Sequence, residues 1–434
     1  MDSVVCLELE DDVLTESATW WWKHVRCPAC HATFDGAGLE NTSVSCAACN
    51  RSFSVRDGVP DLFVAWVPDT ESATRPCSEF IVSEDRVRSI ASGLGLEPEE
   101  ARYDPLASSV VRWRHGFLVA RGVAWVLPVL AMALAMPALL GVAIALIIVD
   151  YALILWQEHR EHARQLRRLL WMVEHGSLHE RDLRDSGAEQ AGPTEPIPGS
   201  DGRREIIDDA LGEIDMQGAT ALCLGCGGAY DTAVGRALVD RGSRVIGLDV
   251  YDPFVQEFSA ELGTAGVVAD ALRLPFEADC VDVACATDVL EHVHDPCRML
   301  REIRRVLRPG GHVLVVTPNR SRARRSWDFL NPLRAAQLLL AAGLGWCAPP
   351  AELLANHAGF EFYHASFTPR QLRDMFRASG LTVRSVRIRS YRSAFGAFRR
   401  YLDHVPLLRY LNDAVLVVAS VPACQVAKQS SDQS

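Results

Sequence analysis

The sequence predicts an α/β protein whose mostly parallel sheet is preceded by a small cysteine-rich module and a hydrophobic helical hairpin. Three observations predict this arrangement. From residue 201 onward, short apolar strands alternate with helical segments, which is the pattern of a parallel sheet covered by helices on both faces. Before that domain come two Cys-x-x-Cys pairs and, at 122–149, a run of 28 residues without a charge.

We divide the chain of 434 residues into four parts. Residues 1–76 form the cysteine-rich module and 77–185 the hairpin with its flanking helices, while 186–200 are a linker rich in Pro, Gly and Ser and 201–434 the α/β domain. The net charge of −11 argues against a general nucleic-acid binder, which needs an excess of Lys and Arg on its binding face. We therefore expect no nucleic acid among the partners.

The four cysteines of the N-terminal module have the spacing of a metal site. Cys27 and Cys30 form one pair, and Cys46 and Cys49 form another. Each pair presents two thiolates on a tight turn, and four sulfur ligands in tetrahedral geometry suit Zn²⁺. Because thiolate fills all four positions, none is left for water, and the zinc is expected to be structural.

The uncharged run at 122–149 is too long for one membrane-spanning helix, which needs about 20 apolar residues, and just long enough for two. Pro137 marks the natural turn, so we expect helices at about 117–135 and 138–156, followed by a charged helix at 159–183. Arginines flank both ends, and the positive-inside rule then keeps both ends in the cytoplasm. This predicts location at the cytoplasmic membrane, with both soluble domains on the cytoplasmic side. A re-entrant hairpin and a buried helix pair are the alternatives.

The α/β domain opens with a nucleotide-binding pattern. After a helix at 203–213, an apolar strand at 219–224 runs into a turn that contains Gly225, Gly227 and Gly228. Glycines there let the backbone take positive φ and approach a ligand closely. Asp249 ends the next strand about 20 residues further on, where an acid that bonds ribose hydroxyls belongs.

The rest of the domain continues the alternation. The expected helices are 231–241, 254–262, 296–307 and 369–379, and the expected strands are 244–248, 266–268, 281–286, 312–317, 381–389 and 413–421.

Five segments carry a specific family resemblance, and they are LGCGGA, GLDV, ADALRLPF, DVLEHVHDP and LRPGGHVLVVTPN. In this order they resemble the class I S-adenosylmethionine-dependent methyltransferases, in particular the branch of the ubiquinone and menaquinone biosynthesis enzymes. The resemblance covers roughly 203–420 and implies a Rossmann-like seven-stranded sheet whose final strand is antiparallel. The N-terminal segment VRCPACHATF similarly resembles the Trm112-like zinc ribbons, some of which act as partners of methyltransferases.

The resemblance implies that S-adenosylmethionine is the cofactor and assigns residues to it. The backbone of the glycine turn would face its methionine part, and Asp249 would accept from its ribose. The acid at the adenine edge would be Asp270, and the sulfonium would lie near the end of the fourth strand. The implied cofactor-binding residues are Gly225, Cys226, Gly227, Asp249, Asp270, Ala271, Thr287 and Asp288.

Two positions depart from the family pattern. Cys223 stands where an acid is common in the first strand, and Ala229 stands where a third glycine is usual. The missing acid removes one possible partner for the cofactor's ammonium, which leaves an inactive binding variant as an alternative.

Two histidines are the candidate catalytic bases, because imidazole accepts a proton near neutral pH. His292 follows the fourth strand, and His364 lies in an insertion at 320–365 where family members build the acceptor site. By analogy with quinone-pathway relatives, Asp288, Glu291 and His292 could also hold Mg²⁺. The alternative is that Glu291 and His292 order the turn through hydrogen bonds.

The insertion begins with four arginines and then becomes apolar, which fits either a surface on anionic lipid or a helix that covers the acceptor site. The prediction is a membrane-associated enzyme that O-methylates a lipid-soluble or lipid-linked small acceptor. The alternatives are a methyltransferase acting on protein or tRNA, and a non-catalytic membrane scaffold with a degenerate methyltransferase fold.

Overall fold

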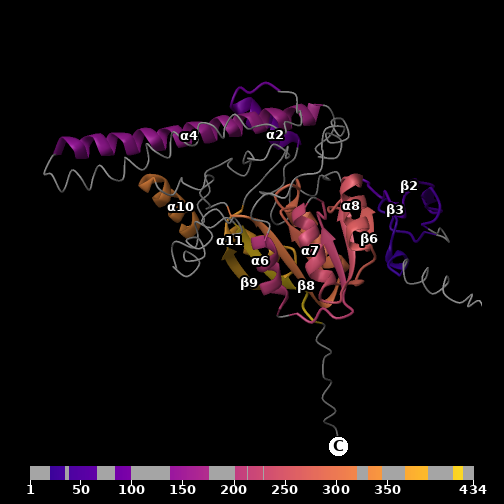
Figure 1. Cartoon of the computed structure of the whole chain (residues 1–434). Helices are drawn as coiled ribbons and strands as arrows, with labels where there is room; N and C mark the ends of the chain where they lie inside the picture. Colours follow the sequence, from indigo (N-terminus) through magenta and orange to yellow (C-terminus); the bar gives the residue numbers. More distant parts are fainter. Residues whose placement is uncertain are drawn as a thin grey trace, which may run out of the picture.

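The computed structural model describes residues 20–34, 39–65, 84–98, 137–174, 201–212, 214–227, 229–319, 331–344, 367–389 and 414–423. At its centre is a seven-stranded sheet of order β6-β5-β4-β7-β8-β10-β9 (Figure 1). The strands are β4 (Thr220–Leu224), β5 (Arg244–Asp249), β6 (Ala265–Val268), β7 (Val281–Thr287), β8 (Leu307–Pro318), β9 (Thr382–Arg389) and β10 (Ala414–Ser420).

The sheet is mostly parallel, as the sequence predicted. Strands β4 to β8 pair in parallel, and only β10 runs antiparallel to its two neighbours β8 and β9. Every residue of β4 and of β10 is buried. Strands covered on both faces read as continuous apolar runs, which is why the sequence located them well.

Five helices pack around this sheet, and their bounds lie within a few residues of those expected. They are α6 (Asp201–Leu211), α7 (Ala229–Val239), α8 (Asp252–Leu262), α9 (Pro296–Val306) and α11 (Pro369–Ala378). Two of them start with a polar side chain that satisfies a backbone N–H of the first turn. Asp295 accepts from the N–H of Arg298 before α9, and Thr368 forms a reciprocal capping box with Gln371 before α11.

The N-terminal module is a three-stranded antiparallel sheet of β1 (Ser43–Ser45), β2 (Ser52–Arg56) and β3 (Val59–Pro60), preceded by the short helix η1 (Trp22–His24). Aromatic packing stabilises it, since Trp21 is only 2% exposed and Trp22 stacks on Phe34 with ring centroids 5.4 Å apart.

The described helices that lie outside these two units are α2 (Glu84–Gly93), α4 (Pro137–Glu174) and α10 (Pro332–Leu344). α4 is a single helix of 38 residues, and Figure 1 shows it running above the sheet, with α10 under one end and α2 beside the other. It runs through the region where two separate helices were predicted, at 138–156 and 159–183. α4 is described from Pro137 onward.

The predicted membrane hairpin is corrected by this arrangement. Its first helix, at 117–135, lies outside the described residues. Its second is the first half of α4, whose Asp150 is hydrogen-bonded to Asn331. Among the residues that the structure describes, none of the helices combines the length and the apolar character needed to cross a membrane. That finding contradicts the predicted location at the cytoplasmic membrane.

Candidate active site

The glycine-rich turn joins β4 to α7 at the carboxyl edge of the sheet. Gly225 has φ of 69°, and a Cβ on it would lie 2.1 Å from Cγ2 of Val289. A Cβ on Gly227 would lie 2.1 Å from Cδ2 of Phe254. Glycine is therefore required at both positions, at the first for backbone conformation and space and at the second for space alone.

Two backbone N–H groups of this turn donate hydrogen bonds to the neighbouring strand β5. The N–H groups of Gly225 and Cys226 both donate to the carbonyl of Leu248, at 2.8 and 3.1 Å. The side chain of Cys226 is fully buried. These two N–H groups are thus engaged by β5, a distinction that the glycine spacing does not reveal.

Asp249 ends β5 at the same edge and is half-buried. Its Oδ1 accepts from the N–H of Tyr251 at 3.0 Å, and this bond holds the carboxylate at the end of the strand. In the sheet, Asp249 lies opposite Val268 of β6. A carboxylate that is fixed and still reaches solvent can accept hydrogen bonds from a diol.

Asp270 and Ala271 follow β6 and are both buried. The Oδ1 atom of Asp270 accepts from the N–H of Leu272 at 2.8 Å, and its carbonyl accepts from the N–H of Arg273 at 2.9 Å. Asp270 therefore shapes the turn after β6, whatever else it contacts.

Thr287 ends β7 and is 2% exposed, and Asp288 follows it with φ of 49°. That left-handed conformation is uncommon for residues other than glycine, and such strain concentrates at functional sites. Asp288 donates its N–H to the carbonyl of Val316 at 2.8 Å. The predicted cofactor residues thus follow four neighbouring parallel strands, where open α/β sheets bind ligands.

The structure argues against the predicted Mg²⁺ site. Glu291 is fully buried, and its Oε2 accepts from the hydroxyl of Thr317 at 2.9 Å. Within the described part of the chain, only the four cysteines of the N-terminal module converge as a metal-binding group of three or more ligands. Glu291 instead ties the turn after β7 to β8, which was the alternative interpretation.

The structure describes one of the two candidate bases. His292 is partly buried in the turn after β7, and its backbone N–H donates to the carbonyl of Val289 at 2.9 Å. His364 lies outside the described residues.

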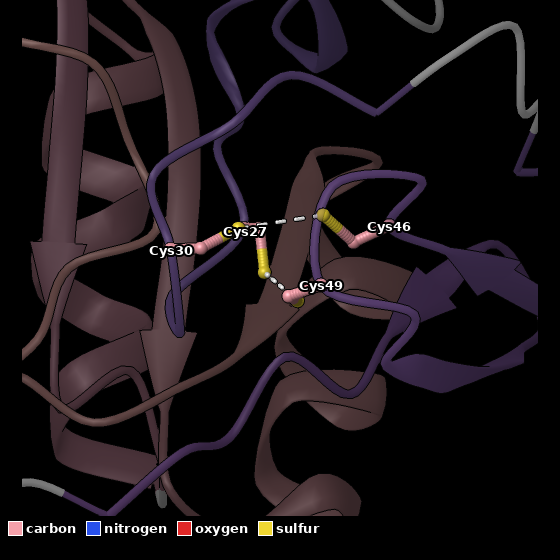
Figure 2. Close-up of side chains that lie close together, drawn as sticks. All are labelled: Cys27, Cys30, Cys46 and Cys49. Atoms are coloured by element: carbon pink, nitrogen blue, oxygen red, sulfur yellow. Dashed lines mark hydrogen bonds between the residues drawn. The ribbon is translucent and has the colours of Figure 1, made fainter.

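The four cysteines converge from two turns, as Figure 2 shows. Their sulfur atoms all lie within 4.8 Å of one another, with 3.7 Å between Cys27 and Cys49 and 3.5 Å between Cys30 and Cys46. Four thiolates at about 2.3 Å from one tetrahedral zinc would be about 3.8 Å apart. The donor set and its spacing therefore fit Zn²⁺.

The N-terminal module packs against the α/β domain. Val25 forms an antiparallel bridge with Phe276, and the guanidinium of Arg244 lies over the ring of Trp20 at 4.4 Å. In Figure 1 the module lies beside β6, at one edge of the seven-stranded sheet.

Comparison with known proteins places this fold. Residues 222–315 match the family model described as "Methyltransferase domain". This match indicates a methyltransferase domain in the α/β part of the chain. The match spans the glycine turn, Asp249, Asp270 and the turn after β7, so it covers every described residue that we assign to the cofactor.

Individual relatives agree with the methyltransferase domain. A ubiquinone biosynthesis O-methyltransferase of Marinobacter nauticus is 29% identical over 192 residues, 42% of this chain and 71% of the relative. A probable S-adenosylmethionine-dependent methyltransferase of Mycolicibacterium smegmatis is 36% identical over 161 residues, 37% of this chain and 58% of the relative. Several other curated relatives are matched over only about half of their length.

A solved S-adenosylmethionine-dependent methyltransferase from Mesorhizobium loti aligns with 51% of this chain and 100% of its own, at 21% identity and a TM-score of 0.35.

Cys223 lies in β4, at the position where the family commonly has an acid. Cys223 is fully buried and lies between Gly247 of β5 and Cys285 of β7. Burial raises the pKa of Cys285 to about 12, so that thiol stays neutral at physiological pH. A buried thiol thus stands beneath the glycine turn, at the position where an acid is common in the family.

Proposed function

We propose that this chain transfers a methyl group from S-adenosylmethionine to a hydroxyl of an apolar small acceptor. Support comes from the methyltransferase domain and from relatives that are named ubiquinone biosynthesis O-methyltransferase. A quinone precursor or a polyprenyl-linked sugar has the chemistry of such an acceptor.

The arrangement at the carboxyl edge carries the cofactor part of the proposal. The backbone of the glycine turn at Gly227 would meet the methionine carboxylate, and Asp249, held by its bond to Tyr251, would accept from the ribose diol. The adenine would lie by Asp270 and Ala271, and the reacting end by Thr287 and Asp288. This assignment places no group of the cofactor on Cys223, which is fully buried.

The insertion after β8 supports the proposal that the acceptor is apolar. Asn319, at the end of that strand, forms a parallel bridge with Phe367, so the insertion leaves and returns at the carboxyl edge. Its helix α10 exposes Leu333 and Leu340, at 43% and 56%. Exposed apolar side chains on this insertion suit an acceptor that is itself mostly apolar.

When bound, S-adenosylmethionine supplies an electrophilic methyl group. The chain then has to align the acceptor and take its hydroxyl proton. His292 is the proposed base, since it follows β7 on the same edge as Asp288, and His364 is the second candidate. The hydroxyl oxygen forms the new C–O bond, its proton passes to the imidazole, and the electrons of the broken C–S bond stay on sulfur.

The test uses the full chain. Calorimetric titration with S-adenosylmethionine should give micromolar affinity, which Asp249→Ala should weaken at least tenfold. Asp240→Ala is the matched control, because Asp240 pairs with Arg204 beyond the far end of α7. Formation of S-adenosylhomocysteine is then measured with phenols that do and do not carry a prenyl tail. Absence of binding by the unaltered chain would refute the proposal, and a preference for tailless phenols would refute the apolar acceptor.

A further inference from the structure

A buried carboxylate of α9 is the centre of a charge network that reaches the segment after Asp270. Glu302 is 3% exposed, and a glutamate is almost never so fully buried unless it is paired. Its Oε1 pairs with the guanidinium of Arg298 at 3.0 Å, and its Oε2 pairs with that of Arg305 at 2.7 Å. Oε2 also accepts from the backbone N–H of Leu274 at 3.1 Å. One acid therefore joins two arginines of its own helix to a segment that lies 28 residues away in the sequence.

Both arginines also bond the backbone of that segment. Arg298 donates through its Nε to the carbonyl of Leu272 at 3.0 Å. Arg305 donates to the carbonyls of Leu274 and Phe276, at 2.9 and 2.6 Å. Side chains of α9 thus satisfy carbonyls at three positions of the 272–276 segment, in addition to the N–H that Glu302 accepts.

The near end of the segment is the turn that contains Asp270 and Ala271, the residues proposed for the adenine. Both are buried. The Oδ1 atom of Asp270 accepts from the N–H of Leu272 at 2.8 Å, while the carbonyl of Leu272 accepts from Arg298. Because one residue carries both bonds, a shift of Leu272 away from α9 would also move the carboxylate of Asp270.

The charges of the network are buried enough to depend on one another. The side chain of Glu302 is 4% exposed, and those of Arg298 and Arg305 are 24% and 29% exposed. Burial lowers the pKa of Arg298, and the carboxylate of Glu302 opposes that shift. Removal of one partner from a buried ion pair leaves the other charge uncompensated. Without the charge of Glu302, the two guanidiniums would therefore be drawn away from the segment toward solvent.

We propose that Glu302 is a positioning residue of the cofactor site and that it acts through Arg298 and Arg305. Together these three side chains hold the turn at 270–273 in the conformation that receives the adenine of S-adenosylmethionine. This inference rests on the proposed function. Pre-organised groups lose less entropy when a ligand arrives, so loosening this turn weakens binding although Glu302 contacts the ligand only through other residues.

Two substitutions separate the charge of Glu302 from the bonds that it orients. Glu302→Gln keeps the size of the side chain and one acceptor oxygen but removes the charge, and it should raise the dissociation constant for the cofactor about ten- to thirtyfold. Arg298→Met keeps an apolar stem and removes the bond to Leu272, and it should raise the same constant about three- to tenfold.

The matched control is Arg301→Met. Arg301 lies on the same helix, and its side chain is 26% exposed, close to the 24% of Arg298. It pairs with Asp295 at 3.5 Å, at the start of α9. We expect Arg301→Met to lower the unfolding temperature and to bind the cofactor like the unaltered chain.

The experiment titrates the full chain and the three variants with S-adenosylhomocysteine by calorimetry, well below the unfolding temperature of each. The titrations are repeated with 5′-methylthioadenosine, which lacks the amino-acid end of the cofactor. We expect Glu302→Gln to weaken both ligands by the same factor, because they share the adenine that the turn receives. A purely structural role would lower the unfolding temperature and leave the affinity of the folded molecules unchanged.

Unchanged affinity in a folded Glu302→Gln would therefore overturn the inference and leave the proposed function standing. If this variant does not fold, the comparison of Arg298→Met with Arg301→Met decides, and an equal loss of affinity in these two would overturn the inference as well. Failure of the unaltered chain to bind either ligand would overturn the proposed function together with the inference.

Discussion

The side-chain amide of Asn331 donates to Oδ2 of Asp150 at 2.9 Å, across 181 residues of sequence. The same amide nitrogen lies 3.0 Å from the carbonyl of Ile147, and the amide oxygen accepts from the first N–H groups of α10. One buried side chain therefore both caps α10 and fixes it to α4, and it pairs the single acid within the apolar half of that helix.

Replacing Asn331 by Ala should loosen α10. The loss of a helix cap costs about 1 kcal/mol, and the loss of a hydrogen bond to a charged acceptor costs about 1.5–3 kcal/mol. We expect hydrogen exchange of the α10 amides to become faster by about two to three orders of magnitude, to about 100–1,000 times the original rate. Asp150→Asn keeps an acceptor oxygen of the same size and should give a smaller effect. Unchanged exchange in Asn331→Ala would show that α10 is held by other contacts.

Metal analysis should find one zinc per chain, and Cys27→Ser should abolish it. Four-cysteine zinc sites contribute directly to folding, so chelation should unfold the N-terminal module. Cys280→Ser is the control, because this cysteine lies in the α/β domain and burial raises the pKa of its thiol to about 12. A zinc content that Cys280→Ser lowers as much as Cys27→Ser would place the metal elsewhere.

Gly225→Ala should destabilise the domain by about 2–4 kcal/mol, as a Cβ would combine positive-φ strain with overpacking against Val289. Gly310→Ala isolates the first of these effects, because Gly310 has φ of 84° and open space around it. Its cost should be about 1–2 kcal/mol. Chemical denaturation measures both, and equal costs would mean that Val289 moves aside freely.

Glu291→Gln should cost about 1–3 kcal/mol of stability through its bond to Thr317. It should not alter the response of methyl transfer to added Mg²⁺, because Glu291 faces Thr317 within the core. Thr317→Val is the companion variant and should cost a similar amount. A Mg²⁺-dependent rate that Glu291→Gln alone abolishes would restore the metal-site interpretation.

The sequence could predict the features that depend on residues close together in the chain. Apolar strands such as β4 and β10, and the helices that start at Pro296 and Pro369, are specified by neighbouring residues, so their bounds were found within a few positions. The cysteine spacing likewise predicted the convergence of Cys27, Cys30, Cys46 and Cys49, because each pair forms its own turn.

Contacts between distant segments could not be predicted in this way. The bridge between Asp61 and Val268 leaves no pattern, because any extended backbone can pair with an edge strand. The hydropathy of 138–156 gave no sign that α4 continues to Glu174, or that Asp150 faces Asn331. The roles of Gly225, Asp249 and His292 in binding and chemistry remain predictions.

The pairing of Leu62 with Val268 has a consequence for how the enzyme behaves in a cell. A two-chain assembly built on such a small contact separates on dilution and depends on balanced synthesis of both subunits. Here the N-terminal module and the α/β domain share one polypeptide. The effective concentration of one at the other is set by the connecting chain, at about the millimolar level. Dilution should therefore not separate the N-terminal module from the α/β domain.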